Sequence, residues 1–206
     1  GQKLHTEGRL DFGKDVIPTA IEAGLPVYGY PTEGYWFDIG TPERYLKAVQ
    51  YLLRQLDAHE LEAEEIMYKI YVQGVSEQSR ELKERLRDYI AEGIIKTEGP
   101  LLVGRHVHIG KDSYLKNSVI DNYVVIEEKA SIEDSVVMDR SYIGKNAVVK
   151  KSIVGRHVYI GEGAVVENSV VADDVTIGEG AYLKKTKVWP HKVVEGGVRL
   201  ESFILL

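Results

Sequence analysis

From residue 103 to residue 205, an aliphatic side chain recurs at steps of six, six and five residues. The repeat is therefore 17 residues long, and no position in the series is polar. Three positions per repeat predict three flat faces, and the bias toward Val and Ile favours strands over helices. A repeat this short cannot bury its apolar side chains alone, so successive copies must stack as a solenoid. The series consists of Val103, Ile109, Leu115, Ile120, Ile126, Ile132, Val137, Ile143, Val149, Val154, Ile160, Val166, Val171, Ile177, Leu183, Val188, Val194, Leu200 and Leu205.

Two further patterns accompany the series. The residue four positions after a member of the series is usually small or branched, and we expect it to point inward as well. Examples are Ala130, Val136, Ala147, Ile153, Ala164, Val170 and Ala181. Glycine often follows a member directly, where we expect a turn between faces to need freedom in φ. These glycines are Gly104, Gly110, Gly144, Gly155, Gly161 and Gly178.

The five-residue step carries its own phrase, as in Asn117-Ser118-Val119-Ile120 and Asn168-Ser169-Val170-Val171. Together these patterns resemble the hexapeptide repeat from about residue 98 to residue 206. The resemblance implies a mainly β fold, a left-handed parallel β-helix of six coils of 17 residues. The left hand comes from the resemblance alone, because the usual crossover rule predicts the opposite hand. Such a prism hosts acyl transfer, metal catalysis and plain scaffolding, so it says little about function.

Composition excludes some classes of protein. The formal net charge of −6 argues against a nucleic-acid partner. The absence of cysteine rules out disulfides and thiolate metal sites and is compatible with a reducing compartment. We find no run of 18 apolar residues and no cleavable leader, so we expect a soluble, cytoplasmic protein with no membrane partner.

Residues 1–57 have a mixed α/β pattern. We expect a helix over about 14–24, and then two strands, 27–30 and 35–39, that pair as a hairpin around a Pro-Thr-Glu-Gly turn. A second helix is expected over about 41–56. Its Thr-Pro-Glu start supplies an N-cap, a proline at the first helical position and a first-turn acid.

Residues 58–97 are predicted to be a helical linker. Ser76 is a candidate N-cap and Gly93 occupies the position after the last helical residue. An apolar stripe between them is typical of a helix docked on its neighbours. The stripe consists of Leu82, Leu86, Tyr89 and Ile90.

Candidate chemistry lies in residues 34–45. Asp38 ends a predicted strand and is followed at once by glycine and a capped helix. Carboxylate oxygens suit Mg²⁺ and a helix N-terminus attracts anions, so this place could hold a cation beside a phosphate. On spacing alone, a plain turn or capping role for Asp38 stays open.

The phrase at 34–45, together with residues 11–18 and 26–30, resembles the closing part of the catalytic domain of sugar-1-phosphate nucleotidyltransferases, the NDP-sugar pyrophosphorylases. Members of that family commonly carry a C-terminal hexapeptide β-helix. The resemblance implies that Asp38 is one of two carboxylates that hold the catalytic Mg²⁺, and that Trp36 lies near the sugar. The implied substrates are a nucleoside triphosphate and a sugar-1-phosphate. An oxygen of the sugar phosphate would attack the α-phosphate and release pyrophosphate.

The resemblance also suggests a division into three parts and a sugar. Residues 1–57 would be the end of the α/β catalytic domain, 58–97 a helical linker and 98–206 the β-helix. The C-terminal Val188-Trp189-Pro190-His191-Lys192 resembles mannose-1-phosphate guanylyltransferase-like members, which points to GDP-mannose. The family's glycine-rich nucleotide loop, its first metal aspartate and its sugar-phosphate lysine would precede residue 1. We therefore expect a C-terminal part with no complete catalytic site, inactive by itself.

Other classes stay open. Hexapeptide acyltransferases usually need a catalytic histidine and often a loop that leaves the coil, whereas the repeat here is unbroken from 103 to 205. His106 and His157 lie three coils apart, roughly 14 Å at a strand spacing of about 4.8 Å, so they cannot share a metal. A noncatalytic regulatory or oligomerisation subunit of the nucleotidyltransferase family is the second alternative.

We also expect a homo-oligomer formed through the β-helix. The apolar residues 203–206 lie in a final coil that the sequence leaves incomplete, and solenoid ends of this kind are normally covered. Tyrosines are predicted to face outward, and aromatic residues are enriched at interfaces. These are Tyr114, Tyr142, Tyr159 and Tyr182.

Overall fold

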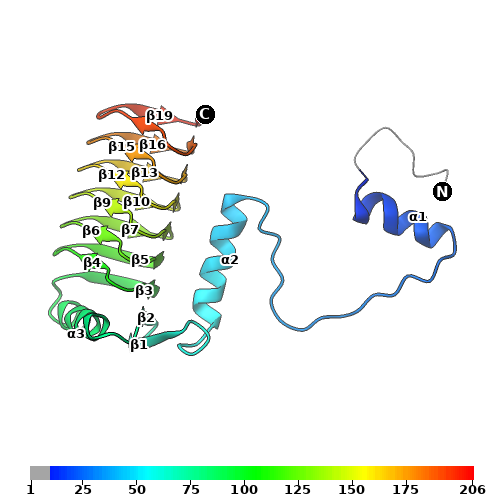
Figure 1. Cartoon of the computed structure of the whole chain (residues 1–206), viewed down its shortest axis with the longest axis horizontal. Helices are drawn as coiled ribbons and strands as arrows, with labels where there is room; N and C mark the ends of the chain where they lie inside the picture. The colour runs from blue at the N-terminus through cyan, green and yellow to red at the C-terminus, as the bar shows by residue number, and fades with distance from the viewer. Residues whose placement is uncertain (1–9) are drawn as a thin grey trace. The chain divides into compact units, whose positions relative to one another are not determined.

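The computed structural model describes residues 10–206. The chain divides into two compact units, Gly1–Trp36 and Phe37–Leu206 (Figure 1). The described part of the first unit contains η1 (Phe12–Val16) and α1 (Ile17–Glu22), after which Gly24 has a φ of 68°. The predicted helix over 14–24 is thus confirmed. Within residues 10–206, every helix is too short or too polar to cross a bilayer.

The predicted hairpin of 27–30 and 35–39 is wrong, because neither segment forms a strand. Tyr28 and Tyr30 are 90% and 88% exposed, so their rings gain nothing from burial. A two-stranded hairpin is marginal in water unless one of its faces packs on something apolar. The alternation of residue types in this segment was therefore not sufficient to form strands.

The second unit begins with α2 (Pro42–Gln55), as predicted. The Thr41 hydroxyl accepts a hydrogen bond from the backbone N–H of Arg44 at 3.3 Å, which confirms the N-cap. The helix buries Leu46 and Leu53 and contacts β3 (Lys96–Val103) and β5 (Tyr114–Ile120). α2 is therefore attached to the side of the solenoid.

The helical prediction for 58–97 is wrong in its first half. Residues 63–73 form an antiparallel hairpin of β1 (Ala63–Met67) and β2 (Ile70–Gln73). β2 also pairs in parallel with β3, with Ile70 opposite Leu101. Residues 70–72 are apolar, favour strands and are buried. As a strand they extend the sheet of the solenoid beyond β3, whereas a helix at this place would leave the edge of β3 uncovered.

The second half of this segment is helical, as predicted. α3 (Glu77–Ala91) starts at Ser76, whose hydroxyl accepts from the backbone N–H of Ser79 at 3.2 Å. Leu82 and Leu86 are 3% exposed and join the core of the solenoid. Gly93 follows the helix with a φ of 70°. Hairpin and helix together cover the first coil.

From β3 onward the chain winds as a left-handed parallel β-helix with one strand of each face per coil. Figure 1 shows the coils stacked one above the other from β3 to β19. One sheet is 6-stranded and uses β4 (His108–Ile109), β6 (Val125–Ile126), β9 (Tyr142–Ile143), β12 (Tyr159–Ile160), β15 (Thr176–Ile177) and β18 (Val193–Val194). A second face consists of β5, β7 (Ser131–Glu133), β10 (Val148–Lys150), β13 (Val165–Glu167), β16 (Tyr182–Lys184) and β19 (Arg199–Glu201). The third face consists of the end of β5, β8 (Val136–Val137), β11 (Ile153–Val154), β14 (Val170–Val171), β17 (Lys187–Val188) and β20 (Ile204–Leu205).

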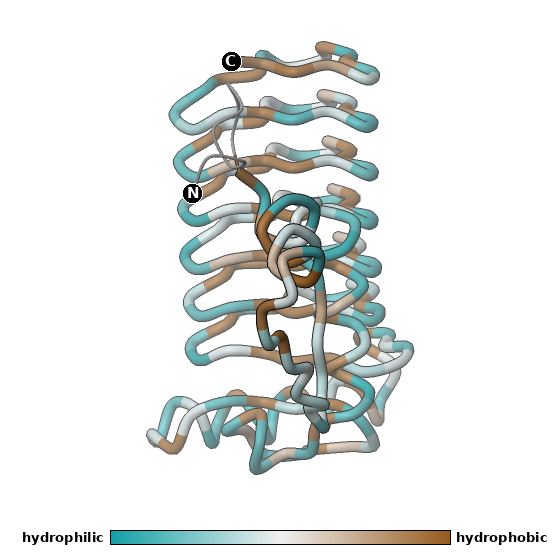
Figure 2. Tube along the Cα trace, turned by 90° about the vertical axis from the view of Figure 1, so that its right-hand side faces the viewer, coloured by the Kyte–Doolittle hydropathy of each residue, from teal (hydrophilic) through white to brown (hydrophobic). Residues whose placement is uncertain are grey.

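The six-six-five series is the core. Ile143 lies between Ile126 and Ile160 in consecutive parallel strands, and all three side chains are 0% exposed. The same order of apolar and polar residues recurs in every coil (Figure 2). Every member of the series is buried except Leu200 and Leu205 in the last coil, which are partly exposed to solvent.

We predicted that the residue four positions after each member of the series also points inward. This is right on two of the three faces only. The alanines Ala130, Ala147, Ala164 and Ala181 are at most 1% exposed. Ile153 and Val170, in contrast, point outward and are half-buried. The inward position at that corner belongs to the preceding hydroxyl residue. The buried hydroxyls are Ser118, Ser135, Ser152, Ser169 and Thr186.

These hydroxyls form a hydrogen-bonded ladder. Ser152 Oγ donates to the carbonyl of Lys150 at 2.7 Å and accepts from the backbone N–H of Ser169, one coil later, at 3.0 Å. The residue before each serine has a positive φ, 47° at Lys151, so the chain turns sharply and the ladder of backbone hydrogen bonds is interrupted. The hydroxyl supplies the missing acceptor, which explains the Asn-Ser and Asp-Ser phrases.

We expect Ser152→Ala to destabilise the protein by about 1–3 kcal/mol, because the buried N–H of Ser169 loses its acceptor. Urea unfolding followed by circular dichroism measures this. Ser131→Ala is the matched control, since Ser131 is half-buried on the outer side of β7 and should cost less than about 0.5 kcal/mol. Equal losses for the two variants would contradict a structural role of the ladder.

The reason predicted for the repeated glycines is also wrong. None of the six glycines that follow the inward series has a positive φ. A Cβ on Gly161 would instead lie 2.6 Å from the backbone nitrogen of Glu179 in the next coil. Close approach of stacked coils excludes a side chain there, whereas the positive φ values fall two residues later, as at Gly163.

Candidate functional site

Asp38 lies just before α2, and its carboxylate is held by the start of that helix. Oδ1 accepts a hydrogen bond from the backbone N–H of Gly40 at 3.1 Å, and Oδ2 forms an ion pair with Nη1 of Arg44. Both side chains are 56% exposed. The preceding ring, Phe37, packs edge-on against Tyr51 with centroids 5.2 Å apart. The turn therefore has a fixed connection to α2 and presents its carboxylate to solvent.

The N-terminus of α2 has its own acid. The backbone N–H of Glu43 and then the Thr41 hydroxyl hydrogen-bond with the Glu43 carboxylate and lower its pKa, and the charges of Lys187 and Lys47 act in the same direction. This is the arrangement of an N-terminal cap, in which the acid also favours the helix dipole. Glu43 is therefore ionised across the physiological range.

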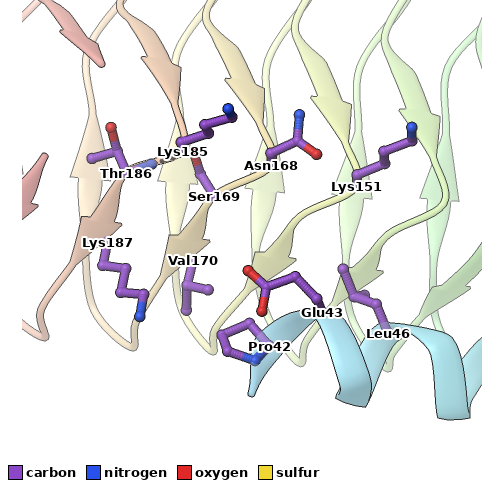
Figure 3. A pocket seen from close by; sticks show the side chains of 10 residues that line it. All are labelled: Pro42, Glu43, Leu46, Lys151, Asn168, Ser169, Val170, Lys185, Thr186 and Lys187. Atoms are coloured by element: carbon purple, nitrogen blue, oxygen red, sulfur yellow. Dashed lines mark hydrogen bonds between the residues drawn. The ribbon is translucent and has the colours of Figure 1, made fainter. Parts of the chain in front are cut away.

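A groove of about 350 Å³ lies between the start of α2 and the β-helix. The helix contributes Pro42, Glu43 and Leu46, and the coils contribute Lys151, Asn168, Ser169, Val170, Lys185, Thr186 and Lys187. Figure 3 shows that Val170 and Lys187 extend to the helix side, whereas Lys151 and Lys185 extend away from it. Because its cations do not converge, the groove marks the boundary of a packed helix, and its form does not indicate an anion site.

The contact between α2 and the third face has a signal in the sequence that the 17-residue repeat alone does not reveal. The outward residues of the third face form an aliphatic column that changes to Lys187 and is followed by Ile204. The aliphatic part of the column includes Leu102, Val119, Val136, Ile153 and Val170. An outward aliphatic column needs a cover, and Leu46 of α2 lines the groove beside it. The change to lysine coincides with the helix start, where Glu43 lies near Lys187.

Trp36 lies in an extended stretch, and its side chain is 82% exposed. Neither a helix nor a strand holds it in place. Its predicted role near a sugar is therefore untested and stays a prediction.

The surroundings of Asp38 agree with the predicted Mg²⁺ site in one respect and disagree in another. A partly exposed carboxylate is the kind of ligand that Mg²⁺ prefers. Across residues 10–206, however, no three His, Cys, Asp or Glu side chains come together as a group that could hold a metal. Asp38 can thus supply one ligand, and the other ligands have to come from elsewhere.

Two of the histidines lie along one corner of the β-helix with a shared acid. Asp174 Oδ1 is 3.4 Å from Nδ1 of His157, and its Oδ2 is 3.6 Å from Nδ1 of His191. His106 lies further down the same corner and stacks on Tyr123, with centroids 4.8 Å apart. All three histidines are turn residues with positive φ. The corner is polar and solvated, so these histidines are surface residues.

Two family models match the chain. A model described as the GMPPB C-terminal domain matches residues 97–204, and a model described as nucleotidyl transferase matches residues 4–55. The first match covers the β-helix, and the second ends with α2. Asp38 lies within the second match.

The curated relatives that match this chain are also nucleotidyltransferases. The glucose-1-phosphate adenylyltransferase of Bacillus cereus (strain Q1) is 35% identical over 132 residues, which are 64% of this chain and 31% of that protein. The enzyme of the same name from Bacillus mycoides (strain KBAB4) is 34% identical over the same shares. The matched part of the chain thus spans about a third of the length of these relatives. The structure of a candidate acetyltransferase from Bacillus cereus is 17% identical, with a TM-score of 0.40 over 52% of this chain and 66% of that one.

Proposed function

Since the chain belongs to the sugar-1-phosphate nucleotidyltransferases with a C-terminal β-helix, we propose that it is part of an enzyme that makes an NDP-sugar and pyrophosphate from a nucleoside triphosphate and a sugar-1-phosphate. One observation carries this proposal: the nucleotidyl transferase match over residues 4–55 and the GMPPB match over 97–204 occur in one chain. Fold alone would not suffice, because β-helices of this kind serve many functions.

In this reaction Asp38 would be one of the oxygen ligands of Mg²⁺, which when bound neutralises charge on the phosphates. The protein groups described here act on Asp38. Arg44 and the backbone N–H of Gly40 each engage one carboxylate oxygen and so fix its orientation. A ligand whose direction is set before the metal arrives loses less entropy on binding. Trp36 would lie against the sugar.

The choice of substrate is a separate proposal. The GMPPB description over 97–204 supports a guanylyltransferase that makes GDP-mannose. The relatives from Bacillus are named for adenylyl transfer to glucose-1-phosphate, which is the second candidate. Pyrophosphate release by the whole enzyme, measured with GTP and mannose-1-phosphate and then with ATP and glucose-1-phosphate, decides between them. A whole enzyme that releases pyrophosphate from neither pair would favour a noncatalytic regulatory subunit.

We further propose that the β-helix serves oligomerisation or regulation, and that the protein is cytoplasmic. Apolar side chains remain open on the last coils, with Trp189 56%, Ile204 55% and Leu206 73% exposed. A contact among copies would cover such side chains.

The chain of residues 1–206 alone is expected not to release pyrophosphate from either substrate pair. The physical reason is that, within the described residues, Asp38 belongs to no group of three or more His, Cys, Asp or Glu side chains that could hold a metal. A coupled phosphate assay with Mg²⁺ and inorganic pyrophosphatase measures this, with the whole enzyme as positive control. Turnover by the pure chain would mean that the site lies elsewhere than at Asp38.

A further inference from the structure

One face of the β-helix carries a column of alternating charge, which we call the charge ladder. It is formed by the outward residue that follows the buried aliphatic residue in β5, β7, β10, β13, β16 and β19. Parallel pairing places Lys116, Glu133, Lys150, Glu167, Lys184 and Glu201 in consecutive coils. Neighbouring coils are about 4.8 Å apart, so the sign of the charge changes at each such step.

Ion pairs within the chain use only every second step of the ladder. Nζ of Lys150 is 3.2 Å from Oε2 of Glu133, and Nζ of Lys184 is 4.0 Å from Oε2 of Glu167. Lys116 pairs in the same direction with Glu98 of the coil before it. Each lysine thus pairs with the preceding coil, and the step between Lys150 and Glu167 stays without an ion pair in the described coils. The ladder side chains are still reachable, with Lys150 40% exposed.

A second column runs beside the ladder on the same strands and is largely uncharged. Its members are Tyr114, Ser131, Val148, Val165, Tyr182 and Arg199. All but Arg199 are half-buried, and the Arg199 guanidinium lies over the Tyr182 ring at 4.0 Å. The face is therefore a flat strip with an uncharged half and an alternating half.

We propose that this face binds the same face of a second copy of the chain, with the two β-helices antiparallel. A two-fold axis parallel to the strands, between the coils of Lys150 and Glu167, keeps each column opposite itself and reverses its order. The ladder is self-complementary under this operation. Lys150 then faces the partner's Glu167, Glu133 faces the partner's Lys184, and Lys116 faces the partner's Glu201. The uncharged columns also meet, which lets them leave water together.

Other arrangements of the same two faces lack this match. A two-fold axis along the solenoid exchanges the two columns, so that each ladder would face an uncharged column and lose its hydration without compensation. An antiparallel shift by one coil places Lys opposite Lys and Glu opposite Glu, which costs several kcal/mol in close contacts. The third face is occupied by α2. Charge complementarity therefore selects both direction and register.

The proposal rests on the proposed function only in that both include self-association, and the readouts are independent. Two charge variants of the chain test it by analytical ultracentrifugation. One changes Lys116, Lys150 and Lys184 to Glu and the other changes Glu133, Glu167 and Glu201 to Lys. We expect the wild-type chain to be dimeric and each variant alone to have a dimer Kd raised by about 100-fold or more, since like charges then face each other. An equimolar mixture of the two variants should form the heterodimer.

The matched control changes three arginines at the opposite corner of the prism, Arg105, Arg140 and Arg156, to Glu. It alters the net charge as much as the lysine variant does and should stay dimeric. The proposal is overturned by a wild-type chain that is monomeric at all concentrations, by variants that keep the wild-type dimer mass, or by folded variants that do not recombine.

A milder set covers the case in which the triple variants do not fold. Lys150→Glu should weaken the dimer because it would face the partner's Glu167. Adding Glu167→Lys in the same chain restores opposite charges between copies, while it leaves like charges against Glu133 and Lys184 within the chain. Recovery of the dimer in the double variant supports the contact between copies. A dimer weakened further by the second change would overturn it. Nucleotidyl transfer by the whole enzyme is a separate measurement, and its absence would speak against the proposed function alone.

Discussion

Replacing Ile143 with Asp is expected to destabilise the β-helix by about 4 kcal/mol or more, among the largest effects of any single change. Ile143 is 0% exposed, and its neighbours above and below in the stack, Ile126 and Ile160, are equally buried. A carboxylate at this position has no charged or polar partner within the core series. It must either stay ionised in an apolar interior or bind a proton, and both cost free energy.

Chemical unfolding of Ile143→Asp and of Thr176→Asp tests this. Thr176 lies in the same 6-stranded sheet but points outward, next to the buried Ile177. Its replacement should cost less than about 1 kcal/mol. A midpoint for Ile143→Asp that equals that of Thr176→Asp would contradict the inward assignment of the series.

The inward series could be predicted from the sequence because a single physical demand repeats at every coil. Each member must fill the same narrow prism, so Val, Ile and Leu recur without exception. The corners were harder to predict, because a buried hydroxyl such as Ser152 looks polar in the sequence. Only its contacts with the Lys150 carbonyl and the Ser169 N–H show that it belongs inside.

The strands predicted near Asp38 and the helix predicted for the first half of 58–97 failed for a different reason. Alternation or periodicity gives only a local preference, and the final structure depends on what covers the element. Residues 70–72 pair with the edge of β3 and form a strand. Tyr28 and Tyr30 have no such partner strand, are exposed and lie in no strand. The α2 helix was predictable because its cap and proline are local signals, and Thr41 forms the expected hydrogen bond.

For the candidate site, the sequence supplied the residue but not its surroundings. Asp38 stood out because a predicted strand, a glycine and a capped helix follow one another there in the chain. Its ion pair with Arg44 spans six residues and needs the first turn of α2 in place. The charge of the distant Lys187 acts on Glu43 only because α2 lies along the third face, which no local pattern indicates.

Replacing Asp38 with Ala in the whole enzyme is expected to lower kcat by about 100- to 1,000-fold, the range typical for the loss of one group that supports transition-state charge. Stability should change little, because the Asp38 side chain is 56% exposed and its ion pair with Arg44 is equally exposed. Asp38→Asn separates charge from shape, since it keeps the Gly40 contact but loses a negative ligand. It should lose nearly as much activity as the alanine variant.

The assay measures kcat against Mg²⁺ concentration, with melting temperature as the folding control. Asp174→Ala is the matched variant, because Asp174 is an exposed aspartate whose carboxylate pairs with His157 and His191 at a corner of the β-helix. It should keep full activity. If Asp38 is a metal ligand, the Mg²⁺ concentration needed for half-maximal rate rises for Asp38→Asn, whereas a capping role would leave it unchanged and lower only the melting temperature. Full activity of Asp38→Ala at limiting Mg²⁺ would show that the turn is structural and that the metal is held by other groups.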